Sequence, residues 1–276
     1  MADKKPKIAA VQMATGSNVS ANLLETERLV AEAAECGAGL VVLPENFAFM
    51  GKRDEDQLAL GEVDGDGPLQ TFLAQLARKY AVWLVGGTIP MTARDAGKVR
   101  SACLLFDDRG DRVARYDKMH LFDVHLVDAD ERYVESATIE PGSEVVVVDS
   151  PFGRLGLAVC YDLRFPELFR IMLERATDIL AIPASFTAIT GKAHWEVLVR
   201  SRAIENLAYV IAAAQGGYHI NGRETHGHSM VVDPWGSVLA QVPRGNGIAA
   251  GILDREYQAT VRRTFPALDH RRLKCG

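Results

Sequence analysis

The chain has 276 residues, is 48% hydrophobic and carries a formal net charge of −5, a composition typical of a globular protein. Its length supports a core without disulfides or metals, and we expect a single domain over residues 1–276. The scattered Lys and Arg residues form no basic stripe, which argues against nucleic acid as a partner, and no stretch approaches the roughly 20 apolar residues of a membrane span. Residues 1–7 lack the apolar core of a signal peptide and the cysteines lie far apart, so we expect a reduced protein in the cytoplasm.

Strands and helices alternate through the first half of the chain. Apolar runs predict strands at 8–13, 40–43 and 82–89, and helical spacing predicts helices at 19–35 and from Pro68 to Tyr80. A turn signature at 107–111 joins two further expected strands, 99–106 and 112–116. The segment 119–144 is the longest irregular stretch, and such loops are often functional.

The second half adds hairpins to this alternation. Strands are expected at 145–148 and 155–160, 179–182, 208–214, 229–233, 237–242 and 248–253, with helices after Pro166, at 192–207 and after Asp254. Strand–helix units followed by β-hairpins predict an α/β fold, with a mixed sheet system and helices packed outside it.

Cys160 closes an apolar run and is followed by turn-forming residues and the expected helix at Pro166. A thiol at a strand-to-helix turn would face a helix N-terminus, which lowers a thiol pKa and offers backbone N–H donors. We therefore predict that Cys160 is a nucleophile. The alternative is a small apolar residue that ends a buried strand.

Glu45 and Lys118 also follow expected strands, at 40–43 and 112–116. Ligands of α/β sheets bind beyond the carboxyl ends of strands, so these side chains and Cys160 could share a site. A carboxylate can take the thiol proton and later activate water, and an ammonium group can stabilise an oxyanion, which suits acyl transfer. Considered singly, Glu45 could be a capping acid and Lys118 a surface charge.

Three segments resemble, in order and spacing, the catalytic motifs of the nitrilase superfamily: Leu43-Pro-Glu-Asn46, Tyr116-Asp-Lys-Met-His-Leu121 and Val159-Cys-Tyr-Asp-Leu-Arg-Phe165. Similar segments at 183–186, 190–196, 200–206 and 227–236 extend the resemblance over nearly the whole chain. The resemblance implies a four-layer α-β-β-α sandwich. It also implies that Cys160 is the nucleophile, Glu45 the general base and Lys118 the third catalytic residue.

The same resemblance implies roles for residues around this triad. Glu135 matches a second glutamate that the superfamily places near the triad, and the backbone N–H of Tyr161 would share the oxyanion with Lys118. Arg164 would bind the carboxylate end of the acyl group, the alternative being that it only pairs with Asp162 or Glu167. Phe186 and Thr190, in two of the further matching segments, are expected to contact substrate.

Within the superfamily, the sequence is most similar to the amidases that hydrolyse deaminated glutathione, a metabolite-repair reaction. This implies a small amide with a keto-acid carboxylate as the substrate, and no metal or cofactor. An ω-amidase acting on α-ketoglutaramate or α-ketosuccinamate is an alternative, as is a hydrolase of N-carbamoyl or aliphatic amides. Lys192 stands where these amidases have proline, and residues 125–131 lack their Pro-Gly loop. Superfamily members pack together, which implies a homodimer or higher homo-oligomer through the helix after Pro166 and the helix at 192–207.

The sequence also raises two other functional classes. His219, His226 and His228 place three imidazoles close together and could indicate a metal-dependent hydrolase, although the spacing matches no established zinc pattern. More simply, His228 makes a local polar contact and the other two lie in a loop. A catalytically inactive interaction protein is opposed by the presence of Glu45, Lys118 and Cys160. The remaining cysteines, Cys36, Cys103 and Cys275, are expected to be structural or incidental.

Overall fold

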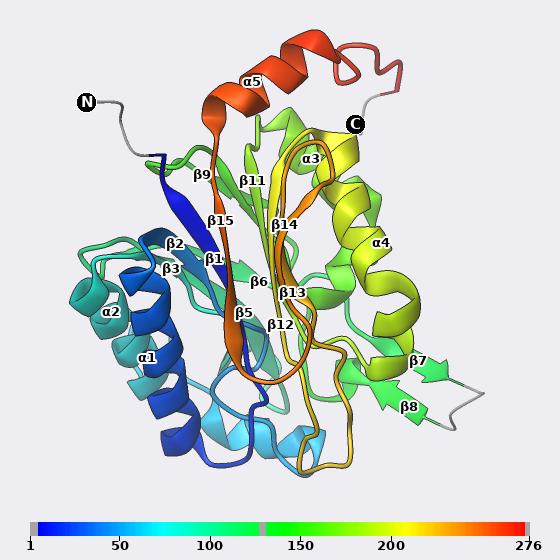
Figure 1. The fold of residues 1–276 in the computed structure, drawn as a ribbon. Coiled ribbons are helices and arrows are strands. Elements are labelled where there is room, and N and C mark those ends of the chain that lie inside the picture. The colour runs from blue at the N-terminus through cyan, green and yellow to red at the C-terminus, as the bar shows by residue number, and fades with distance from the viewer. Residues whose placement is uncertain (1–4, 127–130, 274–276) are drawn as a thin grey trace.

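The computed structural model describes residues 5–126 and 131–273 (Figure 1). Cys275 and most of the 125–131 segment therefore lie outside the described residues. Among the helices that are described, none is both long enough and apolar enough to cross a membrane.

The first sheet has seven strands in the order β15-β1-β2-β3-β5-β4, with β6 paired to β5. Side chains of its strand β1 alternate, so that Ile8 and Ala10 join the core shared with the second sheet, and Ala9 and Val11 join the core under the helices. The strands and the helices that cover this sheet are β1 (Lys7–Gln12), β2 (Ala38–Val42), β3 (Trp83–Val85), β4 (Ile89–Thr92), β5 (Val99–Phe106), β6 (Arg112–Asp117), β15 (Gly247–Ile252), α1 (Val19–Glu35) and α2 (Pro68–Tyr80).

The second sheet has six strands in the order β14-β13-β12-β11-β10-β9. Its elements are β9 (Val146–Val148), β10 (Leu155–Leu157), β11 (Ile179–Ala184), β12 (Tyr209–Ala214), β13 (Ser229–Val232), β14 (Val238–Val242), α3 (Pro166–Glu174), α4 (Ala188–Asn206) and, following β15, α5 (Arg255–Thr264). The two sheets lie face to face, with α1 and α2 on one side and α3 and α4 on the other (Figure 1). The expected four-layer α-β-β-α arrangement is confirmed.

Three sequence expectations need correction. The strand expected at 82–89 is two strands, β3 and β4, because the chain turns at Gly87, where φ is 58° and a Cβ would lie 2.2 Å from the Pro44 carbonyl oxygen. The helix expected at 192–207 already begins at Ala188, because the Thr187 side chain accepts a hydrogen bond from the Thr190 N–H and caps it.

The third correction concerns segment 119–144, which is not irregular. It contains an antiparallel hairpin, β7 (Asp123–Leu126) with β8 (Glu131–Val134), and the short 3₁₀ helix η3 (Glu135–Ala137). A further 3₁₀ helix, η1 (Asp54–Leu60), was also not expected. Residues of both segments line the cavity that contains Cys160.

Candidate active site

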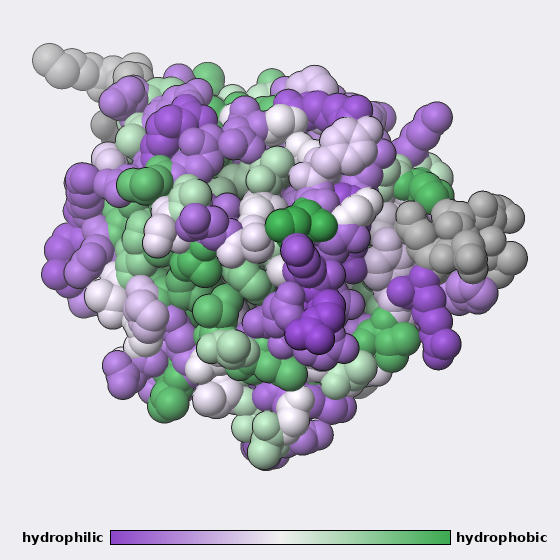
Figure 2. Space-filling view, turned by 90° about the horizontal axis from the view of Figure 1, so that it is seen from below, coloured by the Kyte–Doolittle hydropathy of each residue, from purple (hydrophilic) through white to green (hydrophobic). Residues whose placement is uncertain are grey.

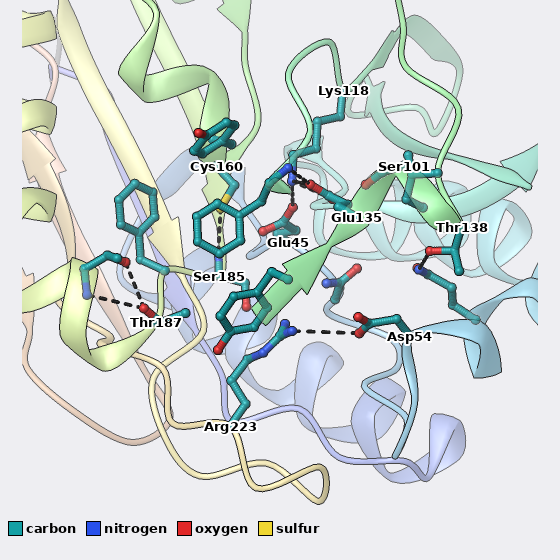
Figure 3. Close-up of a pocket in the computed structure, with 18 of the residues that line it drawn as sticks. Glu45, Asp54, Ser101, Lys118, Glu135, Thr138, Cys160, Ser185, Thr187 and Arg223 are labelled. Carbon is teal, nitrogen blue, oxygen red and sulfur yellow. Dashed lines mark hydrogen bonds and ion pairs between the residues drawn. The ribbon is translucent and has the colours of Figure 1, made fainter. Parts of the chain in front are cut away.

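The residues predicted to be catalytic meet at the seam between the two sheets. Glu45 follows β2 and Lys118 follows β6 in the first sheet, whereas Cys160 follows β10 in the second. All three line one cavity, together with Glu135 (Figure 3). The carboxyl ends of strands from different sheets therefore bring together side chains that are far apart in sequence.

Lys118 lies at the centre of the charged cluster and is almost fully buried. Its Nζ atom is 2.8 Å from Glu45 Oε1 and 2.7 and 2.9 Å from the two carboxylate oxygens of Glu135. Burial opposes the charge, but the carboxylates of Glu135 and Glu45 outweigh it and hold the pKa of Lys118 well above its ordinary value. Lys118 is thus a permanent cation in the wall of the cavity.

Glu135 ties the β7–β8 hairpin to this cluster. Its Oε2 also accepts a hydrogen bond from the Phe122 N–H at 2.6 Å, at the start of the hairpin. Burial raises the pKa of Glu135, and the neighbouring Glu45 carboxylate adds to this, against the opposing effect of Lys118. The sequence expectation that Glu135 lies beside the triad agrees with this geometry.

The sequence predicted that Cys160 ends a strand, and the structure contradicts this. Strand β10 stops at Leu157, and Cys160 is the first residue of the 3₁₀ helix η4 (Cys160–Arg164), ahead of α3. Its φ of 48° lies in the left-handed region, which is costly for a residue with a Cβ. Such strain often marks a functional position, because the surrounding structure must hold it in place.

The expectation of a lowered thiol pKa at Cys160 was wrong. Burial and the adjacent Glu45 carboxylate raise the pKa of Cys160 well above its ordinary value, and Lys118 only partly offsets them. The Ser185 backbone N–H, after β11, points at Sγ over 3.4 Å (Figure 3). The raised pKa keeps the proton on the sulfur, and a base must take that proton before the sulfur can attack.

Asp162 lies in the core and holds in place the turn that carries Cys160. Its fully buried carboxylate accepts hydrogen bonds from the Tyr116 hydroxyl at 2.6 Å, the Val159 N–H at 2.8 Å and the His120 N–H at 3.0 Å. These contacts connect the segments that carry Lys118 and Cys160. Asp162 is therefore committed to the core, and the alternative in which it pairs with Arg164 is contradicted.

Arg164 lines the cavity, as expected for a substrate-binding residue. Its guanidinium lies 5.7 Å from the Tyr161 ring and 5.1 Å from the Phe186 ring, and Nη1 is 3.1 Å from His194 Nδ1. Among the described residues it takes part in no ion pair, Glu167 included, so its charge is available to a ligand.

Phe186 and Thr190, the two other expected substrate contacts, also lie in the cavity wall. Thr190 Oγ1 is 2.9 Å from Thr187 Oγ1, so its hydroxyl also stabilises the start of α4. Tyr161 lines the cavity next to the thiol, where its backbone N–H was expected to contribute to an oxyanion site.

Sequence reasoning missed several residues that line the cavity. They are Asn46, Asp54, Gln57, Ser101, Phe122, Tyr133, Thr138, Ser185, Thr187 and Arg223. Asn46 and Ser185 lie inside segments that carry the resemblance to the superfamily. Asp54 and Arg223 lie in parts of the chain whose local pattern carries no signal of function.

His219, His226 and His228, the three closely spaced histidines, have other contacts. His219 is buried, with Nδ1 2.8 Å from the Thr15 carbonyl oxygen and Nε2 2.8 Å from Thr225 Oγ1. His226 stacks on His228, whose carbonyl oxygen accepts a hydrogen bond from Trp195 Nε1. Within residues 5–126 and 131–273, no group of three His, Cys, Asp or Glu residues is arranged to hold a metal ion.

Comparison with known proteins gives consistent matches over nearly the whole chain. A family model described as carbon-nitrogen hydrolase matches residues 7–263. The deaminated glutathione amidase of Yersinia enterocolitica is 41% identical over 270 residues, covering 98% of this chain and 94% of that protein.

Solved structures agree with these sequence matches. The structure of Saccharomyces cerevisiae Nit3, described as a member of branch 10 of the nitrilase superfamily, is similar with a TM-score of 0.87 and 31% identity, covering 98% of this chain and 97% of that one. An amidase of Nesterenkonia sp. AN1, with acrylamide added to its active-site cysteine, is similar with a TM-score of 0.77 and 26% identity, covering 94% of this chain and 99% of that one.

Proposed function

The chain belongs to the carbon–nitrogen hydrolase family, and on this basis we propose that it is an amidase that hydrolyses deaminated glutathione through a thioester on Cys160. The observation that carries the proposal is the meeting of Glu45, Lys118 and Cys160 in one cavity lined by Arg164. The name of the Yersinia relative supports the substrate, and the active-site cysteine of the Nesterenkonia amidase supports the chemistry.

Acylation begins with a proton transfer, because the raised pKa of Cys160 keeps its thiol protonated. Glu45 accepts the proton as sulfur attacks the amide carbon, and a carbon–sulfur bond forms. The oxyanion is stabilised by Lys118 and the Tyr161 N–H. The carbon–nitrogen bond then breaks, and the leaving amine takes its proton from Glu45.

Deacylation uses the same groups with water in place of the thiol. Glu45 removes a proton from water, which attacks the thioester, and the tetrahedral intermediate again lies against Lys118. Collapse of this intermediate releases the carboxylic acid, and the sulfur recovers a proton from Glu45. The net reaction consumes one amide and one water and yields one acid and one amine.

Arg164 sets the orientation of the acyl group in this proposal. A guanidinium binds a carboxylate with two parallel hydrogen bonds, and here it is steadied by the rings of Tyr161 and Phe186. The keto-acid end of deaminated glutathione supplies that carboxylate, and the amide carbonyl lies at the other end of the acyl chain. Binding at Arg164 would therefore bring the amide to Cys160.

The proposal includes a single domain that works in the cytoplasm as a homodimer or higher homo-oligomer. Exposed apolar side chains on α4 support such an interface, because Val197 is 66% exposed and Ile204 is 46% exposed. Light scattering at micromolar concentration tests it, since a monomeric mass would contradict the assembly.

A substrate panel tests the function. Deaminated glutathione, α-ketoglutaramate, an N-carbamoyl amino acid and an aliphatic amide would be compared by release of amine or ammonia. The expected result is the highest kcat/KM with deaminated glutathione. Equal or better hydrolysis of α-ketoglutaramate would assign the protein as an ω-amidase, and equal hydrolysis of uncharged amides would remove the role of Arg164.

A further inference from the structure

We propose that Arg223 binds the carboxylate of the leaving amine, so that the cavity recognises its substrate at both ends. This inference rests on the proposed function and adds a second anion-binding subsite to the same cavity. Arg223 lies in the loop between β12 and β13 and reaches the cavity wall at the end away from Lys118 (Figure 3).

Ring contacts fix the order of groups along one wall. Arg164 lies over Tyr161, whose ring centroid is 5.1 Å from that of Phe122. Phe122 is in turn 5.1 Å from Tyr133, and the guanidinium of Arg223 lies 4.6 Å from the Tyr133 ring. These contacts link the two guanidinium groups through three successive aromatic rings, and Cys160 directly precedes Tyr161, the ring next to Arg164.

Arg223 has donor groups to spare. Its side chain is only 20% exposed, and its nearest carboxylate oxygen, on Asp54, is 3.8 Å away, beyond hydrogen-bonding distance. Among the described residues, the guanidinium of Arg223 donates no hydrogen bond to a side chain or to the backbone. Asp54 is 52% exposed, so its carboxylate is accessible to solvent and does not depend on Arg223, and a ligand carboxylate can bind the guanidinium.

The recess outside Arg223 is also electropositive. It is lined by four cationic side chains and one carboxylate, namely Lys52, Arg53, Arg132, Arg223 and Asp54. Hydrophilic side chains cover much of this end of the molecule, with hydrophobic patches between them (Figure 2). A cationic recess attracts an anionic group toward Arg223 before the amide reaches the thiol.

The two candidate substrates differ at this end. Hydrolysis of deaminated glutathione releases a dipeptide that carries its own carboxylate, whereas hydrolysis of α-ketoglutaramate releases ammonia. Arg223 can therefore contribute to the first reaction and has nothing to bind in the second. Recognition at Arg223 would separate a dipeptide-releasing amidase from an ω-amidase with the same catalytic groups.

The test measures KM for both substrates in wild type, Arg223→Ala and Arg223→Lys. Arg223→Ala is expected to raise KM for deaminated glutathione by about 10- to 100-fold, the effect of losing a charge-assisted contact, and to leave KM for α-ketoglutaramate unchanged. Arg223→Lys is expected to recover part of the loss. Arg28→Gln, on the exposed surface of α1, controls for the loss of one positive charge.

A second arm changes the substrate in place of the protein. In this arm the C-terminal carboxylate of deaminated glutathione is converted to an amide. The wild type should bind the amidated substrate as weakly as Arg223→Ala binds deaminated glutathione itself. KM for the amidated substrate should be the same in the wild type and in Arg223→Ala. Equal KM increases for both substrates would mean that Arg223 only supports the loop, and no increase would remove the subsite; either result overturns the inference. A wild type that cleaves α-ketoglutaramate but not deaminated glutathione would overturn the proposed function instead, and the inference with it.

Discussion

Lys118 and Glu135 form a two-point ion pair, with Nζ 2.7 Å and 2.9 Å from the two carboxylate oxygens. Glu135 is therefore a positioning residue for the lysine and for the hairpin next to it. Glu135→Gln keeps an acceptor for the Phe122 N–H but removes the negative charge that lies next to the Lys118 ammonium group. We expect kcat to fall by roughly 10-fold or more with little change in thermal stability, measured by steady-state kinetics and calorimetry. Wild-type kcat in this variant would show that Glu45 alone positions the lysine.

Cys160→Ala should abolish turnover, because no thioester can form. Little volume is lost, so the free energy of unfolding should stay within about 1 kcal/mol of wild type. Mass spectrometry of the wild type during turnover should detect an acyl adduct on the peptide that contains Cys160. Cys36→Ala is the control, since that thiol lies at the end of α1 and hydrogen bonds to the Ala33 carbonyl oxygen. Activity near wild type in Cys160→Ala would refute the nucleophile assignment.

Glu45→Gln preserves the size of the side chain and removes the base. We expect kcat to fall by about 10²-fold or more, because neither the thiol nor water can then be deprotonated efficiently. Rapid-quench measurements should show that acylation and deacylation both slow. A loss confined to one of the two steps would mean that a different group serves as the base in the other.

Lys118→Ala should affect both activity and stability. The oxyanion loses its cation, which typically costs about 10²-fold or more in kcat. The buried Glu45 carboxylate and the Glu135 carboxylate, whose side chain is 20% exposed, would then face each other without a counter-charge, at a cost of about 3 kcal/mol in the free energy of unfolding. Urea unfolding measures this loss, and Lys79→Ala, which breaks an exposed pair with Glu27, should show almost none.

Stability should decline at alkaline pH. Burial raises the pKa of Cys160 and of Cys103 in the folded protein, and raises the pKa of Tyr209 to about 12. A group with a raised folded pKa contributes full stability below its unfolded pKa, and the contribution is lost as pH rises toward the folded pKa. For the thiols this loss begins near pH ~8.5. Urea unfolding from pH 7 to 10 should show the decline, and Cys160→Ala should make it shallower.

Arg164→Lys should raise KM for keto-acid amides by about 10-fold or more, because an ammonium group cannot reproduce the planar fork. KM for an uncharged aliphatic amide is the internal control and should not change. Steady-state kinetics with both amides measures the difference. An unchanged KM for keto-acid amides would contradict the orientation proposed for the acyl group.

Hydrophobic periodicity predicted the alternation of strands and helices, whereas the four-layer arrangement and the roles expected for Glu45, Lys118 and Cys160 followed from the resemblance to the nitrilase superfamily. Hydrophobic periodicity defined α1 and α2, and strand ends followed by reactive residues identified Glu45 and Lys118. The raised pKa of Cys160 could not be predicted, since it depends on burial and on a carboxylate from another sheet. The same holds for Arg223, whose place in the cavity depends on a ring in the β7–β8 hairpin.

The seam between the sheets also couples enzymatic activity to the integrity of the fold. Gln215, after β12, donates hydrogen bonds to the Glu45 carbonyl oxygen at 2.9 Å and to Thr15 Oγ1 at 2.7 Å, and so joins the second sheet to the first beside the site. A partial separation of the sheets would leave each sheet's own hydrogen bonds intact while moving Cys160 away from Glu45. In mild denaturant, catalysis should therefore be lost before circular dichroism detects any change, which makes turnover a sensitive gauge of sub-global opening.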